Sequence, residues 1–184
     1  PAEVTFVDAC AAPGARRVLT NVDDSQVTDT VPFPFRYWGA AVSAVNIASN
    51  GFINFDGVTS ASTSGLIPDR STPNGVVAAY WLDLLTRETG VCIATVGAAP
   101  NRRFVVQWAD ASYYPSRTGN LTFEIVLNET SNTIDMLYQS LGTATNAVTL
   151  GLETVDGTDG ALLCSGSTAC PVMSGSRIRW VPTP

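Results

Sequence analysis

The chain has 184 residues, of which 45% are hydrophobic and only 14% are charged, and its formal net charge is −6. An acidic chain lacks the basic stripe that nucleic acid requires, and it is repelled by anionic membrane surfaces. No apolar run approaches the length of about 18 residues that a membrane-spanning helix needs. We therefore expect neither nucleic acid binding nor membrane insertion.

The sequence contains no histidine and no lysine, since all ten basic residues are arginines. This absence removes the usual general base, the Schiff-base amine and the most common transition-metal ligand. Arginine stays protonated and does not relay protons. The composition therefore predicts a binding or structural module rather than an enzyme. Because lysine codons are rich in adenine, the all-arginine set also indicates a GC-rich, bacterial source.

The first half of the chain shows strand patterns separated by turn signals. Glu3–Val7 is expected to form the first strand. Val45–Ile47 leads through Asn50-Gly51, a dipeptide typical of tight hairpins, into the apolar run Phe52–Phe55. Gly75–Leu85 is mostly apolar, and we expect it to form one buried strand.

The second half continues this pattern without a helical period. Apolar residues alternate along Asn120–Leu127 and again along the returning run Thr133–Gln139. The other expected strands are Val91–Val96, Arg103–Trp108, Val148–Val155, Gly160–Cys164 and Arg177–Val181. Short strands joined by Gly, Asn, Asp and Ser turns predict an all-β fold with little helix, a two-sheet antiparallel β-sandwich. We expect a single domain over residues 1–181 and the start of a linker at residues 182–184.

The four cysteines are Cys10, Cys92, Cys164 and Cys170. Without histidine or a CxxC motif they are unsuited to a zinc site. Cys164 and Cys170 flank a run of small residues that can close a tight loop, which predicts that they form a disulfide and leaves Cys10 to pair with Cys92. Disulfides persist in oxidising compartments, so this pairing predicts an extracellular protein, secreted or on the cell surface. Four free thiols in a cytosolic protein are the alternative.

Three stretches between residues 23 and 152 carry a resemblance to a known family. They are Pro32–Gly39 (PFPFRYWG) with Val45–Phe55 (VNIASNGFINF), then Val77–Asp83 (VAAYWLD), then Arg103–Trp108 (RFVVQW) with Leu121–Leu127 (LTFEIVL). In this order and spacing they resemble the nidogen-like extracellular domain, which also occurs in plexin-domain-containing receptors and in bacterial secreted proteins.

The resemblance implies an extracellular module of adhesion or matrix proteins, usually one of several in a longer chain. It implies no catalytic activity. The sequence departs from the family pattern at Leu82-Asp83, where many relatives carry two acidic residues. This departure lowers the expectation of a metal at that position.

Aromatic residues occur in three doublets, Tyr37-Trp38, Tyr80-Trp81 and Tyr113-Tyr114. Neighbours in a strand point to opposite faces, so one member of each doublet can offer its ring to a glycan or a protein. All six are therefore candidate ligand-binding residues, and Tyr113-Tyr114 is the doublet most expected to be exposed. The alternative is that both members of each doublet pack in the interior.

Aspartates supply the hard oxygen ligands that suit calcium, the one cofactor that the sequence admits. Asp23, Asp24 and Asp83 are the preferred candidates. No D-x-[DN]-x-[DN]-G loop is present. Asp156 and Asp159 each precede a glycine and serve equally well as turn formers.

A pair of carboxylates can run glycoside hydrolysis without histidine, and Glu124, Glu129 and Glu153 are the candidate acids. Glu124 lies on the strand face opposite Phe123 and Ile125, where we expect it to face solvent or a groove. Nothing in the sequence holds two carboxylates at a set distance, so no catalytic residue is predicted.

These observations predict a non-catalytic recognition or adhesion module of a larger secreted or surface protein, which binds another extracellular protein. The alternatives are a lectin-like, carbohydrate-binding module, with or without calcium, and an accessory domain beside a secreted hydrolase. Apolar strands with few charges, such as Phe104–Trp108, pair with other chains when they lie at an exposed edge. Self-association is therefore expected if such a strand is exposed.

Overall fold

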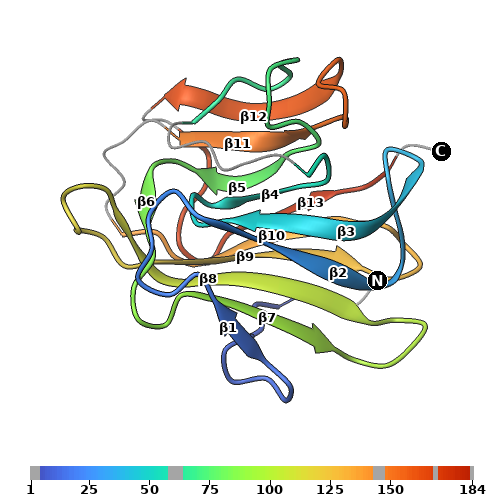
Figure 1. Cartoon of the computed structure of the whole chain (residues 1–184), viewed down its shortest axis with the longest axis horizontal. Helices are drawn as coiled ribbons and strands as arrows, with labels where there is room; N and C mark the ends of the chain where they lie inside the picture. The colour runs from blue at the N-terminus through green and yellow to red at the C-terminus, as the bar shows by residue number, and fades with distance from the viewer. Residues whose placement is uncertain (1–4, 58–63, 143–147, 168–169, 183–184) are drawn as a thin grey trace.

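The computed structural model describes residues 5–57, 64–142, 148–167 and 170–182, and all regular elements among them are β-strands. The strands form two antiparallel sheets that pack face to face, which confirms the predicted all-β sandwich (Figure 1). Within the described ranges, no helix is long and apolar enough to cross a membrane. Residues 183–184 of the expected linker and residues 1–4 lie outside these ranges.

The larger sheet has seven strands, in the order β1-β7-β8-β9-β10-β13 with β6 paired to β8. They are β1 (Arg16–Val18), β6 (Leu84–Leu85), β7 (Val91–Val96), β8 (Arg103–Tyr113), β9 (Leu121–Asn128), β10 (Ile134–Ser140) and β13 (Arg177–Trp180). Because β8 lies between β7 and β9, Phe104–Trp108 is interior to the sheet. Edge pairing through this run therefore does not apply to the folded protein.

The smaller sheet has six strands, in the order β12-β11-β5-β4-β3-β2. They are β2 (Gln26–Tyr37), β3 (Ala40–Ala48), β4 (Phe52–Asn54), β5 (Val77–Trp81), β11 (Val148–Glu153) and β12 (Gly160–Ser167). The chain leaves this sheet at Leu82-Asp83 and enters the larger one at β6. The prediction of one strand over Gly75–Leu85 is therefore wrong, because the run is broken where the chain changes sheets.

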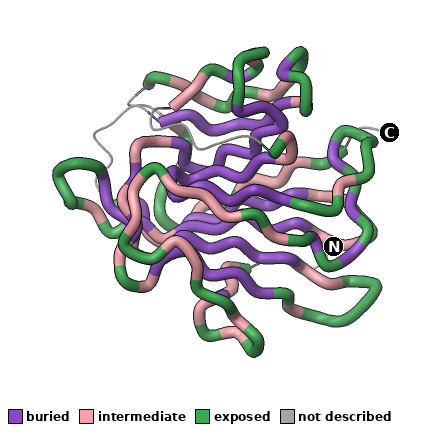
Figure 2. Tube along the Cα trace, viewed as in Figure 1, coloured by how far each residue is buried: buried purple, intermediate pink, exposed green. Residues whose placement is uncertain are grey.

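The main core lies between the sheets and follows the predicted alternation. On β9, Phe123 and Ile125 are buried, and on β10 so are Met136 and Tyr138. Trp108 stacks on Phe123, with ring centroids 5.0 Å apart. Buried segments run through the central strands of both sheets, whereas the connecting loops are exposed (Figure 2). Burial of these apolar faces supplies the main driving force for folding.

A second apolar cluster lies on the outer face of the larger sheet, beneath the N-terminal segment (residues 5–12). Ala9 packs there with Val105 and Val126, and its N–H donates to the Gln107 side-chain oxygen at 2.6 Å. Residues 5–7 are not in a strand, so the expected first strand is wrong over its described part. The segment covers the sheet by side-chain packing and isolated hydrogen bonds.

Glu124 is buried beneath the N-terminal segment, which corrects the expectation that it faces solvent or a groove. Its carboxylate accepts a hydrogen bond from the Val7 N–H, with 3.2 Å between nitrogen and Oε1. Strand alternation correctly puts Glu124 on the outer face of the sheet. That face is not open to water, because a segment distant in sequence lies over it.

Both predicted disulfides are present, Cys10–Cys92 and Cys164–Cys170, and the described residues hold no free cysteine. The first joins the N-terminal segment to β7, and the second joins Cys164, within β12, to Cys170. The first pairing spans 82 residues and the second only 6. The N-terminal segment is thus covalently fixed to the sheet that it covers.

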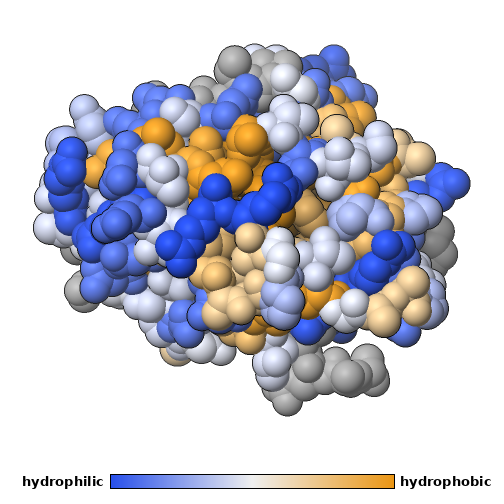
Figure 3. Space-filling model, turned by 60° about the horizontal axis from the view of Figure 1, so that its bottom comes forward, coloured by the Kyte–Doolittle hydropathy of each residue, from blue (hydrophilic) through white to orange (hydrophobic). Residues whose placement is uncertain are grey.

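The edge strands carry features that discourage pairing with another chain. β1 and β13 are short and contain arginines, β2 contains Pro32 and Pro34, and β12 is bulged against β11. Short length, charge, proline and bulges are common means of protecting sheet edges. On the face shown in Figure 3, apolar areas are likewise separated by hydrophilic side chains.

We expect Gly51→Ala to destabilise the fold by about 2–3 kcal/mol, because two penalties combine at this turn. Gly51 has a φ of +81°, and an added Cβ would lie 2.1 Å from the Tyr80 carbonyl oxygen. Gly39→Ala is the matched control, since Gly39 has a φ of +79° with no atom within 4 Å of the added Cβ. Urea unfolding of both variants separates the clash from the backbone strain, and equal losses would contradict the role of the clash.

Candidate metal centre

Asp83 is far from the adjacent pair Asp23-Asp24 in the sequence, but the three residues meet in the fold. Asp23 and Asp24 lie in the loop between β1 and β2, and Asp83 lies where the chain changes sheets. One carboxylate oxygen of each residue lies within 4.8 Å of the other two. We call these residues the acidic trio. They are the three residues that the sequence favoured as metal ligands.

Thr86 fastens the loop that carries Asp23 and Asp24 to the segment after β6. The Thr86 N–H donates to the Val22 carbonyl oxygen at 3.0 Å, and the Thr86 hydroxyl accepts from the Val22 N–H at 3.1 Å. The hydroxyl oxygen also lies 2.5 Å from the Leu19 carbonyl oxygen, to which it donates. Because Thr86 follows Asp83 closely in sequence, these bonds bring the two parts of the acidic trio together.

Asn50 links the trio to the turn between β3 and β4. Its side-chain nitrogen donates to Asp24 Oδ1 at 2.9 Å, and its side-chain oxygen accepts from the Leu84 N–H at 3.1 Å. Its carbonyl oxygen accepts from the Leu82 N–H at 3.2 Å. Asn50 is fully buried and contacts both chain neighbours of Asp83. The predicted Asn50-Gly51 turn is confirmed, but its polar link to the trio is not visible in the sequence.

The carboxylates of Asp23 and Asp83 repel each other and are partly buried. Burial raises the pKa of Asp23, and the neighbouring Asp24 raises it further. Burial also raises the pKa of Asp83, with added repulsion from Asp23 and Asp24. The Oδ1 atoms of Asp23 and Asp83 are buried without a hydrogen-bond partner among the described residues. A cation would satisfy both oxygens and remove the repulsion.

The donor set fits calcium. Calcium takes about 6–8 oxygen ligands at about 2.3–2.6 Å, so opposite ligands lie about 5 Å apart. The oxygens of the acidic trio lie within 4.8 Å of one another, and all are carboxylates. Softer metals prefer imidazole or thiolate, and this chain has no histidine and no free cysteine among its described residues. Water and backbone oxygens would complete the shell.

Two of the three aromatic doublets have one buried and one exposed member, and the exposed member lies in the turn just after the strand. Tyr37 is buried while Trp38 is 43% exposed, and Tyr113 is buried while Tyr114 is 47% exposed. The Tyr80-Trp81 doublet follows the alternative, since Tyr80 packs in the main core and Trp81 packs against Phe52 on the outer face of the smaller sheet. Of the six candidate residues, Trp38 and Tyr114 are the exposed ones, and the other four are buried.

Tyr114 lies beside the acidic trio. Its N–H donates to the Asp83 carbonyl oxygen at 3.1 Å. Tyr113 pairs in register with Leu84, the residue after Asp83. The exposed Tyr114 thus lies just after β8, the strand that pairs with β6 next to Asp83.

The three glutamates are each held by other groups of the fold. Burial raises the pKa of Glu124 to about 8, and it raises the pKa of Glu153 to about 7. Glu153 accepts from the Asp69 N–H at 3.0 Å. Glu129 forms a salt bridge with Arg102 at 2.6 Å, and this hydrogen-bonded pairing lowers its pKa. Glu124 lies on β9 of the larger sheet beneath the N-terminal segment, whereas Glu153 lies on β11 of the smaller sheet.

Comparison with known proteins supports a family assignment. A family model described as NIDO related matches residues 2–180, nearly the whole chain. No curated protein and no solved structure matches it. The matched range includes the acidic trio and both disulfides.

Proposed function

The chain belongs to the NIDO-related (nidogen-related) family, and we propose that it is a non-catalytic, extracellular recognition module that binds another protein. We further propose that this module binds calcium at the acidic trio. Its all-β fold is compatible with a non-catalytic module, and its two disulfides suit an oxidising compartment. The observation that carries the calcium part of the proposal is that the three carboxylates meet, with the Oδ1 atoms of Asp23 and Asp83 buried and without a hydrogen-bond partner among the described residues. In such a module calcium would fix the loops that carry Asp24 and Asp83.

Calcium is expected to stabilise the folded protein, because it binds the assembled trio and not the unfolded chain. At a concentration of about 100 times Kd, the free energy of unfolding should rise by about 2.7 kcal/mol. For a domain of this size that corresponds to a rise in Tm of about 5–10 °C. Thermal unfolding with calcium and with a chelator measures the shift, and calorimetric titration measures Kd.

Asp83→Asn is the test variant, since it keeps the side-chain shape and removes one charge of the trio. Asp159→Asn is the matched control, because this exposed aspartate is in the turn before β12 and its Oδ1 accepts from the Gly160 N–H. Loss of the calcium response in the first variant alone supports the site. A wild-type protein with no heat of binding and no change in Tm at millimolar calcium would rule out the calcium part of the proposal.

A second candidate function is calcium-assisted carbohydrate binding, favoured by Tyr114. This exposed tyrosine follows β8, the strand that pairs with β6, and its backbone N–H donates to the Asp83 carbonyl oxygen. A sugar could therefore stack on the Tyr114 ring while the hydroxyl groups of the sugar reach the calcium ion. A glycan array with and without chelator tests this function. Hits that disappear both with chelator and in Tyr114→Ala would favour it over protein recognition.

A further inference from the structure

A groove opens in the smaller sheet where β2 separates from β3. The strands pair at Thr30 with Ala44 and again at Phe35 with Val42. Between these pairs, four residues of β2 stand against Ser43 alone. The extra residues bow β2 outward and away from its neighbour.

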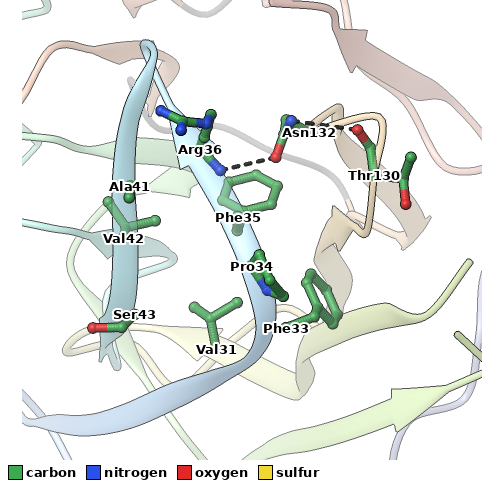
Figure 4. Close-up of a pocket in the computed structure, with 10 residues that line it drawn as sticks. All are labelled: Val31, Phe33, Pro34, Phe35, Arg36, Ala41, Val42, Ser43, Thr130 and Asn132. Atoms are coloured by element: carbon green, nitrogen blue, oxygen red, sulfur yellow. Dashed lines mark hydrogen bonds between the residues drawn. The ribbon is translucent and has the colours of Figure 1, made fainter. Parts of the chain in front are cut away.

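The groove has a volume of about 650 Å³, which is within the range of ligand pockets. Pro34 and Val42 form part of its apolar lining above the nearly buried side chains of Val31 and Phe35, and Arg36 and Asn132 add polar groups. Figure 4 shows Val31 and Val42 on either side of the gap between the strands, with Asn132 on the loop across from Phe35. The site is therefore apolar with a cationic and an amide group at its rim.

Contacts with the larger sheet hold the groove open. The Arg36 N–H donates to the Asn132 side-chain oxygen at 2.8 Å. Arg102 donates to the Pro32 carbonyl oxygen at 3.0 Å, and its guanidinium lies over the Phe33 ring, 5.4 Å from the centroid. These bonds fix both ends of the bowed segment, so a ligand would meet a preformed site.

The outward side of β2 carries residue types that are enriched in protein interfaces. Burial alternates along the strand, so Pro34 and Arg36 are exposed while Phe35 and Tyr37 are buried. Trp38, which is 43% exposed, lies in the turn that follows β2. Arginine and tryptophan are enriched at binding hot spots. Because the prolines lack N–H groups, this edge cannot accept an added strand by a regular ladder, and recognition must use side chains.

Arg36 gives the groove a preference for negative charge. Its guanidinium donates to the Gly39 carbonyl oxygen at 2.7 Å, and the ion pairs found among the described residues involve other arginines. A guanidinium has five N–H donors, which leaves several for a carboxylate. A cation beside an apolar groove favours a ligand that carries both an apolar side chain and a nearby carboxylate.

We propose that this groove binds an extended segment of a partner protein, which places an apolar side chain in the groove and a carboxylate on Arg36. Residues i and i+2 of an extended chain lie on the same side about 6.8 Å apart, so a peptide with the two side chains at these positions can present both to the groove. The inference rests on the proposed function only in that the partner is a protein. It does not depend on calcium.

The test uses three blocked pentapeptides as probes, with the sequences Gly-Phe-Gly-Asp-Gly, Gly-Phe-Gly-Asn-Gly and Gly-Ala-Gly-Asp-Gly. NMR titration of the labelled protein reports which amides move. With the Phe/Asp peptide, shifts are expected for residues 31–43 and 130–132. The Asn and Ala peptides should each bind about tenfold more weakly, since each lacks one of the two contacts.

Arg36→Gln is expected to weaken the binding of the Phe/Asp peptide about tenfold, so that this peptide no longer binds more tightly than the Asn peptide. Arg70→Gln, at another exposed arginine, is the control and should leave the affinities for both peptides unchanged. The absence of shifts at the groove, or equal binding of all three peptides, would overturn the inference. Repeating the titration with a chelator keeps the two proposals distinct, because groove binding should persist whether or not the acidic trio binds calcium.

Discussion

Between about pH 5 and about pH 9 the wild-type protein is expected to lose stability, and Glu124→Gln is expected to remove about 4 kcal/mol of that loss. Burial beneath the N-terminal segment raises the pKa of Glu124 from 4.5 to about 8. Arg103 and the Val7 N–H act in the opposite direction, whereas Asp135 and Asp8 add to the rise. Glutamine keeps an oxygen to accept from Val7 and has no charge to bury.

The direction of this change in stability with pH follows from the number of protons that each state binds. Below about pH 4.5 Glu124 is protonated in both the folded and the unfolded chain, so it adds no pH dependence. Between about pH 4.5 and about pH 8 the folded state holds a proton that the unfolded state has released, and stability falls as the pH rises. Each unit of pKa difference corresponds to about 1.4 kcal/mol. Glu153, whose pKa is raised to about 7, acts in the same direction and remains in the variant.

Urea unfolding at a series of pH values measures this effect, with Glu88→Gln as the control for loss of an exposed carboxylate. The N-terminal segment is the cover that must move before water reaches Glu124. Protease cleavage within residues 5–9 should therefore increase at high pH in the wild-type protein and not in Glu124→Gln. Parallel pH profiles for the two proteins would show that Glu124 is not the titrating group.

The sandwich was predictable because the apolar faces of the strands pack against one another between the two sheets. Alternation along β9 and β10 identifies the core residues, since Phe123 and Met136 pack between the sheets. Glu124 was mispredicted for a different reason. Alternation identifies which face a residue lies on, but not what covers that face, and the cover of Glu124 comes from Val7, 117 residues away.

The acidic trio was predictable in its members and not in its supports. Asp23-Asp24 is conspicuous as an acidic doublet, and Asp83 follows a strong apolar run. No local signal marks Thr86 or the side chain of Asn50, because each acts through backbone groups that only the folded chain brings near. The groove beside β2 was not predicted, since its bulge depends on the register between two strands and not on either strand alone.

Cys10→Ala with Cys92→Ala is expected to lower the free energy of unfolding by about 4 kcal/mol, one of the largest losses available in this fold. In the chain-entropy account a disulfide stabilises by restricting the unfolded chain, and its effect increases with the length of the closed loop. The 82-residue separation of this pair predicts about 4–5 kcal/mol, against about 2 kcal/mol for the 6-residue separation of Cys164 and Cys170. The double alanine variant of that second pair is the matched control.

The loss of the long disulfide should also change the pH profile, which distinguishes a local effect on the N-terminal segment from a general loss of stability. Cys10 fixes the segment that buries Glu124, and without it the segment is held by apolar packing and by hydrogen bonds such as that from Ala9 to Gln107. A segment that lifts readily lets water reach Glu124, so the pKa of this carboxyl should fall toward its ordinary value. The decline in stability between about pH 5 and about pH 9 should then flatten in the Cys10/Cys92 variant but not in the Cys164/Cys170 variant. Equal losses of stability and identical pH profiles for the two variants would contradict the role assigned to Cys10.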